Sequence, residues 1–433
     1  MSQNHSEALR HSLEQLGSQV SEYDKIFLHV LAPVMTDYVR WVLESAHAEG
    51  IDKLYFLARD GWVMYELAKS IRSKLGINMD LEYIHVSRYV LRNAEYYFLG
   101  RKCLESLCIG GIDITFEKIM KRAALSDAEI KRVAIEVGFE DRIDECLSYA
   151  QIQELKIRLD AFGIYFFEIV KRNSKKFYED VTNYFDFVGL SDNTDYAIVD
   201  SGWLGTTARS IGNIISYMTG SKRNIKGYYF GIYELPKGGN KTNYKEYYLH
   251  PGRDINRKTK FSICLFETIF SSSEGMTMGY RNIEDRCVAV LSEKGNPNHK
   301  LQARNMELLK MYEGFLEAGD LSIRQVEKLL SLFMGNPTKN EAKIFGGLQF
   351  CDDVLELQLQ NVAAKWDINE LKKQTFFRKI SIKFFKSDSK LHESGWPEGS
   401  IVNLVGTGLR SKWSLFNERL YKRGMYVRKA IKK

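Results

Sequence analysis

Two short glycine-containing segments of the sequence combine charged or hydroxyl side chains with a helical pattern that follows them. The first runs Phe56-Leu-Ala-Arg-Asp-Gly61, directly after an apolar run. Gly61 lets a ligand approach the backbone closely, and a helix that starts here offers free N–H groups and the positive end of its dipole. Arg59 adds a planar donor that suits two phosphate oxygens. The alternative is an ordinary tight turn with Arg59 and Asp60 in solvent.

The second segment runs Val199-Asp-Ser-Gly-Trp-Leu-Gly-Thr-Thr207, between another apolar run and another helical pattern. Its two glycines free the backbone, and its hydroxyl side chains can donate, so the pattern predicts a loop that wraps a phosphate group. We expect Asp200, at the strand end, to accept hydrogen bonds from sugar hydroxyls. The predicted phosphate loop comprises Ser201, Gly202, Trp203, Leu204, Gly205, Thr206 and Thr207.

Two alternatives apply to this second segment. It can be the start of a helix capped by Ser201 or Thr206, with no ligand at all. The indole of Trp203 can stack on a substrate or pack the loop from inside, and the sequence favours packing.

The elements around both segments indicate how they are positioned. Four short apolar runs predict strands: Lys53–Ala58, Leu81–Val86, Tyr196–Val199 and Lys226–Tyr233. Helical patterns at 62–74 and 208–218 follow the first and third of these runs. Strands that alternate with helices favour an α/β fold with a mostly parallel sheet, where ligands bind beyond the carboxyl ends of the strands. Both segments occupy that position.

The chain is predicted to have three parts. Residues 1–88 and 191–295 form the α/β core. Residues 89–190 read as a large helical insertion that serves as a lid or an acceptor subdomain, or else only in packing or dimerisation. Residues 296–433 form a helical region that ends in a basic tail.

Composition excludes several classes of protein. The 433 residues are 44% hydrophobic and 27% charged, as in an ordinary soluble protein. The polar N-terminus has no apolar core of a signal peptide, and no run of about 20 apolar residues predicts a membrane span. We therefore expect a cytoplasmic protein. The six cysteines are scattered and expected to be reduced, and the eight histidines form no zinc-binding pattern.

Positive charge is concentrated at the end of the chain. From Leu371 to Lys433 there are 16 Lys and Arg against 4 Asp and Glu, so this segment is near +12 while the rest is near −5. Basic and aromatic residues alternate in Phe376-Phe-Arg-Lys379, Lys383-Phe-Phe-Lys386 and Leu420-Tyr-Lys-Arg423. This pattern suits an anionic membrane face, which would make the protein peripheral to the inner side of the membrane. A nucleic-acid surface and a solvated tail are the alternatives.

The order strand-ARDG-helix-strand-Val-Ser, then strand-Asp-loop-Gly-Thr-Thr-helix, resembles the type I phosphoribosyltransferases over about 180 residues. In that family the first loop binds pyrophosphate, and the second is an apolar run, two acids and a threonine-rich phosphate cradle. Here Tyr196–Val199 is similar to the apolar run, Asp200 to one acid, and Gly205-Thr206-Thr207 to the end of the cradle. The chain departs from the pattern in having only one acid.

A narrower resemblance comes from FLARDG, VSR and VDSGW in this order. They are similar to a domain of bacterial surface-polysaccharide synthesis that adds ribofuranose and often follows a phosphatase in the same chain. The resemblance implies a transferase that moves 5-phosphoribosyl from phosphoribosyl pyrophosphate (PRPP) to a sugar hydroxyl of a glycan. A lipid-linked glycan would match the membrane interpretation of the basic segment. A separate phosphatase would remove the 5-phosphate, because this chain has no DxDx[TV] motif.

The resemblance also implies roles for single residues. Arg59, Asp60, Gly61 and Arg88 would face pyrophosphate with Mg²⁺, for which Asp60 is a candidate ligand, and Asp200 would hold the ribose. Asp60 and Asp200 are the candidate general bases, since a sugar hydroxyl is a weak nucleophile. Glu267 and Glu274 are the runners-up for the base, although exposed glutamates of a polar loop are the stronger alternative. Together with Arg92 they are also candidates for the acceptor site.

Two other functions stay open at this point. The same fold could transfer phosphoribosyl to a base or another small acceptor. It could also be a PRPP-sensing regulator without enzymatic activity, whose basic segment binds nucleic acid. The sequence does not distinguish a monomer from an oligomer.

Overall fold

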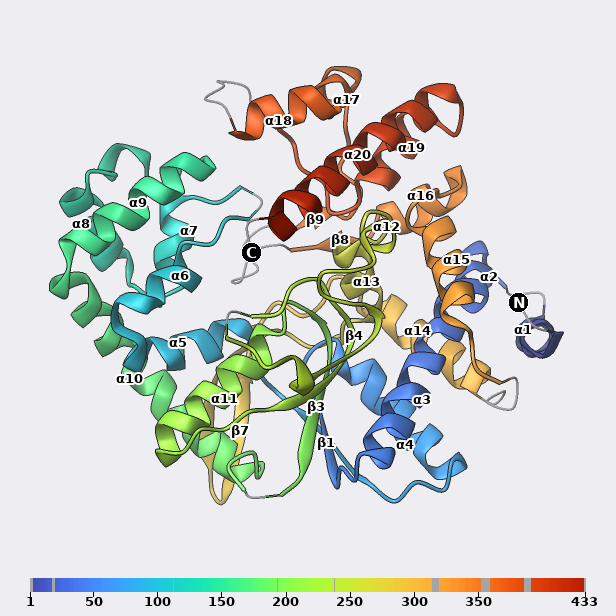
Figure 1. Ribbon diagram of the computed structural model, residues 1–433, viewed down its shortest axis with the longest axis horizontal. Coiled ribbons are helices and arrows are strands. Elements are labelled where there is room, and N and C mark those ends of the chain that lie inside the picture. The colour runs from blue at the N-terminus through green and yellow to red at the C-terminus, as the bar shows by residue number, and fades with distance from the viewer. Residues whose placement is uncertain are drawn as a thin grey trace.

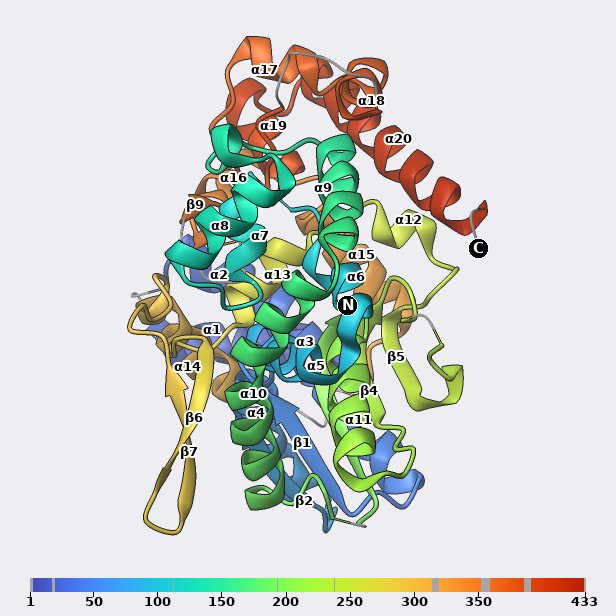
Figure 2. The ribbon, with the colours of Figure 1, turned by 90° about the vertical axis from the view of Figure 1, so that its left-hand side faces the viewer.

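The computed structural model describes residues 3–17, 20–111, 113–192, 194–236, 238–313, 319–351, 359–384 and 391–431. A parallel sheet lies at the centre, and helices cover both of its faces (Figures 1 and 2). The helices of the 89–190 segment extend to one side of the sheet, and the C-terminal helices lie above it in Figure 1.

All five strands of the central sheet run parallel, in the order β2-β1-β3-β4-β5. This confirms the α/β fold with a mostly parallel sheet. The chain reverses its direction of strand addition between β1 and β3, and in doubly wound sheets of this order the crevice at that switch point is where ligands bind. The strands are β1 (Lys53–Leu57), β2 (Asp80–Ile84), β3 (Tyr196–Trp203), β4 (Lys226–Ile232) and β5 (Tyr244–Leu249).

Alternating side chains of the strands supply two separate cores. Leu54 and Phe56 of β1 point to one face, which the N-terminal helices and three later ones cover. Tyr38 of this layer donates its hydroxyl to the backbone oxygens of Asp200 and Tyr228, at 3.1 and 3.2 Å, and so ties β3 and β4 to the helix beneath. The layer consists of α2 (Glu22–Ile26), η2 (Phe27–Leu31), α3 (Ala32–Ala48), α4 (Gly61–Lys74), α13 (Ile263–Phe270), α14 (His299–Glu313) and α15 (Ile323–Phe333).

Tyr55 and Leu57 of β1 point to the opposite face, where a second set of elements packs. Tyr55 donates its hydroxyl to the carbonyl of Val188 at 2.6 Å, at the end of a long helix of this layer. The layer consists of α5 (Arg88–Leu99), α10 (Ile164–Phe187), α11 (Thr206–Thr219) and the antiparallel hairpin β6 (Thr277–Ile283) with β7 (Arg286–Leu291).

Between α5 and α10 the chain forms a helical body with its own core. A capping box of Ser126 and Glu129 begins its helix at residue 127. The helices of this body are η3 (Gly100–Cys103), α6 (Leu104–Leu107), α7 (Phe116–Lys121), α8 (Asp127–Val137), η4 (Glu140–Arg142) and α9 (Tyr149–Phe162). The flanking helices α5 and α10 cover the sheet, so the 89–190 segment is partly scaffold for the sheet as well as an addition to it.

The region after residue 296 is mainly helical but does not form a single separate body. Its first helices, α14 and α15, belong to the core beneath the sheet, whereas Trp366, Ile401 and Leu415 form a small core of their own. The remaining elements of the chain are α1 (Gln3–Leu16), η5 (Lys241–Asn243), α12 (Ile255–Lys258), α16 (Lys339–Gly346), β8 (Gln349–Phe350), β9 (Gln360–Asn361), α17 (Ile368–Lys373), α18 (Phe376–Phe384), α19 (Pro397–Val405) and α20 (Leu409–Ile431).

One helical stretch among the described residues, Glu22–Ala48, has the length and apolarity of a membrane span. It comprises α2, η2 and α3, and 78% of its apolar window is buried inside the protein. Its side chains form the core against the sheet, which accounts for its apolar character.

Candidate functional site at the carboxyl edge of the sheet

The two glycine-containing segments meet, although about 140 residues separate them. They lie at the carboxyl ends of β1 and β3, which are neighbours, with Phe56 paired to Val199. The hydroxyl of Ser201 donates to the carboxylate of Asp60 at 2.5 Å and joins the two segments directly. The peptide bond between Ala58 and Arg59 is cis. The segments therefore meet at the switch point of the sheet, where ligands bind in folds of this order.

The second segment is less of a loop than the sequence predicts. The strand does not end at Val199 but continues through Asp200, Ser201 and Gly202 to Trp203, because the backbone of β4 pairs with it as far as Ile232. Only Leu204 and Gly205 lie between strand and helix, and α11 begins at Thr206. The predicted loop from residue 200 to residue 207 is therefore wrong. These residues form the end of β3, a two-residue turn and the start of α11.

Gly202 is fixed by both its conformation and its surroundings. Its φ is +104°, and a Cβ atom would lie 2.6 Å from the carbonyl oxygen of Gly231. Gly220, at the end of α11, also has a positive φ, +70°, but meets nothing within 4 Å. We expect Gly220→Ala to lower the free energy of unfolding by about 1 kcal/mol, the cost of the left-handed backbone alone.

Gly202→Ala adds the collision with β4 to that conformational cost, so we expect a loss of about 3 kcal/mol. Denaturant unfolding of the two variants measures the difference. Equal losses would mean that β4 is free to move away from β3 at this point.

Trp203 packs the site from inside. Its side chain is 8% exposed and belongs to the core below the sheet, among Phe261 and Phe266. The indole N–H donates to the carboxylate of Glu267 at 2.7 Å. The indole thus holds the carboxylate of Glu267 in place, and its contacts fit packing instead of stacking on a substrate.

Three carboxyl groups lie together at this edge of the sheet, and their burial and mutual repulsion shift their pKa values. Burial, together with the charges of Asp60 and Glu267, raises the pKa of Asp200 to about 8. Burial and the charge of Asp60 raise the pKa of Glu267 to about 7. Burial also raises the pKa of Asp60, against the hydrogen bond from Ser201 and the positive charge of Arg59. Ionisable groups whose pKa values are strongly shifted are typical of functional sites.

Arginines border the carboxyl groups. Arg59 and Arg88 both lower the pKa of Asp60 and of Glu267, so both lie near them. Arg88 is exposed, at the first position of α5 behind the Ser87 cap. Among the described residues neither Arg88 nor Arg92 forms an ion pair. Burial and the charge of Arg88 lower the pKa of Arg92 to about 10, which places these two on one side of α5.

The segment after α13 completes the wall of the site. The amide of Ser272 donates to the carbonyl of Arg59 at 3.2 Å, and the neighbouring Ser271 lowers the pKa of Asp60, so this segment lies against the first of the two glycine-containing segments. Glu274 lies apart from Glu267, because it accepts from Tyr83 at 3.2 Å and pairs with the His85 ring at 3.1 Å. Ser271 and Ser272 were not predicted, although three serines directly after an apolar helix are a usable signal.

The helix α11 begins at this same edge of the sheet, with two residues between it and the end of β3. Gly205 adopts a left-handed conformation at the N-cap of α11, and a Cβ there would lie 2.5 Å from the ring of Tyr244. Within the described part of the chain, the hydroxyls of Thr206 and Thr207 form no hydrogen bond with protein, and both side chains are partly exposed. Free N–H groups and hydroxyls at a helix start suit a phosphate.

The protein does not build a metal site from its own side chains within the described ranges, since no group of three or more His, Cys, Asp or Glu is arranged to hold an ion. Asp60, Asp200 and Glu267 therefore lack the arrangement of ligands that a closed metal centre has. Their mutual repulsion still favours a cation arriving with a ligand, because a nearby positive charge stabilises ionised carboxylates.

Comparison with known proteins finds neither a family model nor a curated protein that matches this chain. The functional assignment consequently depends on the chemistry of the site.

Proposed function

We propose that the protein is a phosphoribosyltransferase that moves 5-phosphoribosyl from PRPP to a sugar hydroxyl of a bacterial surface glycan. It would release pyrophosphate and leave removal of the 5-phosphate to a separate phosphatase. The fold would then be of the phosphoribosyltransferase type. The bacterial glycan rests on the resemblance of FLARDG, VSR and VDSGW, and the transfer rests on the site.

One observation carries the proposal: Ser201 of one segment bonds to Asp60 of the other at the switch point. This contact supports a shared site for two candidate anion-binding features at one edge of the sheet. The arginines Arg59 and Arg88 suit a pyrophosphate, and the start of α11 at Thr206 suits a phosphomonoester. PRPP carries both groups on one ribose, and the carboxyl groups between them suit its hydroxyls.

The reaction breaks the bond between C1 of the ribose and an oxygen of pyrophosphate and forms a bond from C1 to the acceptor oxygen. The acceptor hydroxyl loses a proton, and pyrophosphate leaves with the electron pair of the broken bond. Positive charge develops at C1 on the way, and an ionised Asp200 would stabilise it. Arg59 and Arg88 would neutralise the charge that grows on the leaving group.

The general base is one of the carboxylates that burial has made more basic. A pKa near the working pH is best for this role, and Asp200 at about 8 and Glu267 at about 7 both meet it. Asp60 is less available as the base, because one of its oxygens accepts the hydrogen bond from Ser201. Glu274 is bound to His85 and Tyr83, so we assign it a supporting role.

Mg²⁺ fits this site as a companion of the substrate. It binds through one or two carboxylates plus phosphate oxygens and keeps several waters, and the site offers oxygen donors without a closed cage. Asp60 is the carboxylate nearest the proposed pyrophosphate end. When bound, Mg²⁺ supplies charge neutralisation of the pyrophosphate.

The direct test is incubation with PRPP, Mg²⁺ and candidate acceptors. We expect a glycan acceptor to gain a phosphoribosyl group, read by mass spectrometry, with one pyrophosphate released per product. Transfer to a free base would establish the small-acceptor alternative. Binding of PRPP without turnover on any acceptor would indicate a sensor, and no binding at all would exclude every PRPP-dependent function.

Pyrophosphate and ribose 5-phosphate each carry one of the two anionic ends of PRPP. Binding of each one alone tests whether the site has two separate ends. We expect Arg88→Ala to abolish the rise in unfolding midpoint that pyrophosphate with Mg²⁺ causes, while the rise with ribose 5-phosphate persists. Thr207→Val should do the reverse. A ligand at about 100 times its Kd stabilises by about 2.7 kcal/mol, so each loss is measurable. Arg132→Ala, exposed on α8, is the control and should respond to both. Identical behaviour of Arg88→Ala and Thr207→Val would contradict the two-ended site.

A further inference from the structure

The outer face of α20 carries a row of exposed apolar side chains. Leu409, Trp413, Phe416 and Leu420 recur at spacings of three and four, so they lie on one face of the helix. The exposed fraction is 85% for Leu409, 64% for Trp413 and 53% for Phe416. Single exposed apolar residues are normal, but a continuous row of them marks an interaction surface.

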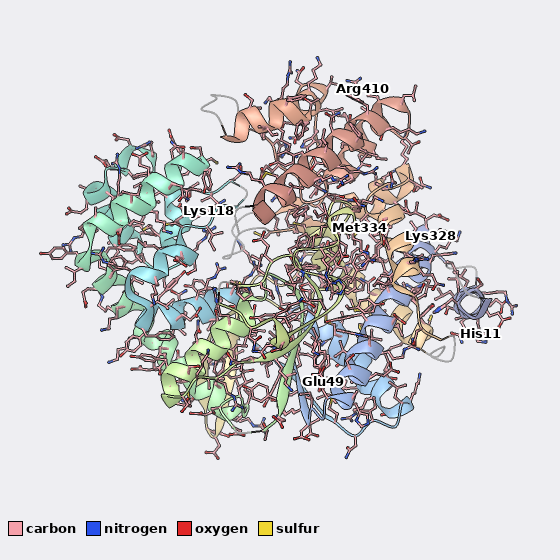
Figure 3. All side chains as sticks on the ribbon, in the orientation of Figure 1. His11, Glu49, Lys118, Lys328, Met334 and Arg410 are labelled. Carbon is pink, nitrogen blue, oxygen red and sulfur yellow. The ribbon has the colours of Figure 1, made fainter. Side chains whose placement is uncertain are left out.

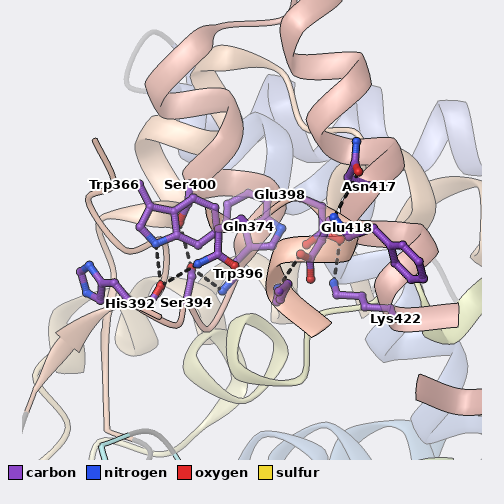
Figure 4. Close-up of polar contacts among 12 residues, drawn as sticks. Trp366, Gln374, His392, Ser394, Trp396, Glu398, Ser400, Asn417, Glu418 and Lys422 are labelled. Carbon is purple, nitrogen blue, oxygen red and sulfur yellow. Dashed lines mark hydrogen bonds and ion pairs between the residues drawn. The ribbon is translucent and has the colours of Figure 1, made fainter. Parts of the chain in front are cut away.

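The helix cannot turn this row inward, because its opposite face is fixed. Glu418 pairs with Lys379 of α18 at 2.7 Å, and Lys422 pairs with Glu398 of α19 at 2.7 Å. Figure 4 shows Glu418, Lys422 and Glu398 on the inner side of the helix. Rotation of α20 would break two buried ion pairs, which is strongly destabilising. Lys379 and Lys422 were expected to form part of the basic surface, but they lie inside.

Positive charge flanks the apolar row. Arg410, Lys412, Arg423 and Arg428 are exposed on α20, and Figure 3 shows Arg410 at the outer edge of the molecule. The only acid of this helix, Glu418, is buried and paired. The face is therefore apolar along its middle and basic at its sides. The Lys383–Lys386 part of the predicted basic segment lies largely outside the described residues.

We propose that this face of α20 lies in the surface of an anionic membrane. Helices that bind at the interface have an apolar face with tryptophan or phenylalanine, flanked by Lys and Arg that attract acidic headgroups. A second copy of the chain would bring like charges together across a two-fold axis, and a nucleic acid would leave the apolar row unsatisfied. Charge complementarity thus favours a lipid surface. This inference does not depend on the proposed transfer.

The position of α20 links that surface to the site. Near its end, Tyr426 packs on Tyr233, with ring centroids 5.7 Å apart, and the amide of Tyr233 donates to the carbonyl of Trp203 at 2.7 Å. The helix thus contacts the chain directly after β4, at the carboxyl edge of the sheet (Figure 1). In Figure 2 it runs along the edge of the molecule toward the C-terminus. A lipid-linked acceptor in the same membrane would lie near the site.

Cosedimentation with vesicles tests the surface. We expect the full chain to bind vesicles of phosphatidylcholine with phosphatidylglycerol, to release them as salt rises, and to ignore pure phosphatidylcholine. Trp413→Asp with Phe416→Asp should lower the vesicle partition by about tenfold or more, since charged groups enter the apolar face. The control is Ile157→Asp with Tyr165→Asp, residues 70% and 68% exposed on the helical insertion, with the same change in charge. It should bind like the wild type.

A second measurement identifies the contact itself. Brominated acyl chains should quench part of the tryptophan fluorescence, and Trp413→Phe should remove that part while vesicle binding persists. Three results would overturn the proposal: no binding by the wild type, equal binding by the Trp413/Phe416 and control variants, or an oligomer that the Trp413/Phe416 variant dissociates. Transfer to a water-soluble acceptor should be unchanged in the Trp413/Phe416 variant, so failure of this proposal is distinct from failure of the proposed function.

Discussion

Asp200→Asn is expected to lower the turnover of phosphoribosyl transfer by about 10²–10³-fold, the usual loss when a group that acts in the transition state is removed. Asparagine keeps the size of the side chain and can still contact ribose hydroxyls, but it can neither stabilise positive charge at C1 nor take a proton. The KM for PRPP should change little, because Arg88 and Thr207 hold the two ends. Steady-state kinetics with PRPP and the acceptor measures both quantities.

Asp195→Asn is the matched control, since Asp195 is exposed just before the same strand and its replacement should leave turnover unchanged.

The pH profile of turnover identifies which carboxylate is the general base. If Asp200 is the base, wild-type turnover should rise toward a pH of about 8, and this rise should vanish in Asp200→Asn. If the rise instead centres near pH 7 and vanishes in Glu267→Gln, the base is Glu267. Wild-type turnover in Asp200→Asn would remove Asp200 from the mechanism.

Local patterns predicted those elements that local chemistry determines. The apolar runs at 53–58 and 226–233 are strands to within a residue, and the helices after β1 and β3 begin near their glycines. The meeting of the two segments also followed from sequence, because parallel strands that precede helices place their carboxyl ends at one edge. The bond between Asp60 and Ser201 is the detail that gives this meeting chemical meaning.

Features set by distant partners were not predictable in this way. The segment Asp-Ser-Gly-Trp is polar and reads as a loop, yet β4 extends it as strand by pairing Gly202 with Gly231. The strand β5 (Tyr244–Leu249) and the hairpin of β6 and β7 have mixed patterns that leave strand and loop equally plausible.

Glu267 illustrates a signal that sequence reasoning undervalued. The sequence makes it only a secondary candidate and favours an exposed residue of a polar loop. The structure places it in α13, an apolar helix, where it accepts the indole N–H of Trp203. A single acid within an apolar helix must be paired or functional, because burying an isolated carboxylate is costly. The partner lies 64 residues away, so the sequence alone does not reveal it.

The carboxyl cluster is also expected to control stability. In the unfolded chain Asp200 and Glu267 ionise near their ordinary pKa values of 3.8 and 4.5, whereas in the folded protein these pKa values are about 8 and 7. Between these limits the folded state holds protons that the unfolded state has lost. The free energy of unfolding must therefore fall as the pH rises from about 5 to 8. The pKa values of Asp24 and Asp254 are lowered, so these two groups change the free energy of unfolding only at more acidic pH.

Removing the charge should reverse this loss. We expect Asp200→Asn with Glu267→Gln to stabilise the free protein by about 2–4 kcal/mol at pH 8, since one pKa unit corresponds to about 1.4 kcal/mol and the two groups share their repulsion. At pH 5 this gain should be smaller, and it should vanish only below about pH 4, where both acids are protonated in the unfolded chain as well as in the folded protein. Denaturant unfolding at both pH values measures the effect, with Asp195→Asn as control. If the stability of the wild type instead rises from pH 5 to 8, these carboxyl groups are solvated or already paired. Their pKa values are then not raised, and the proposed general base loses its support.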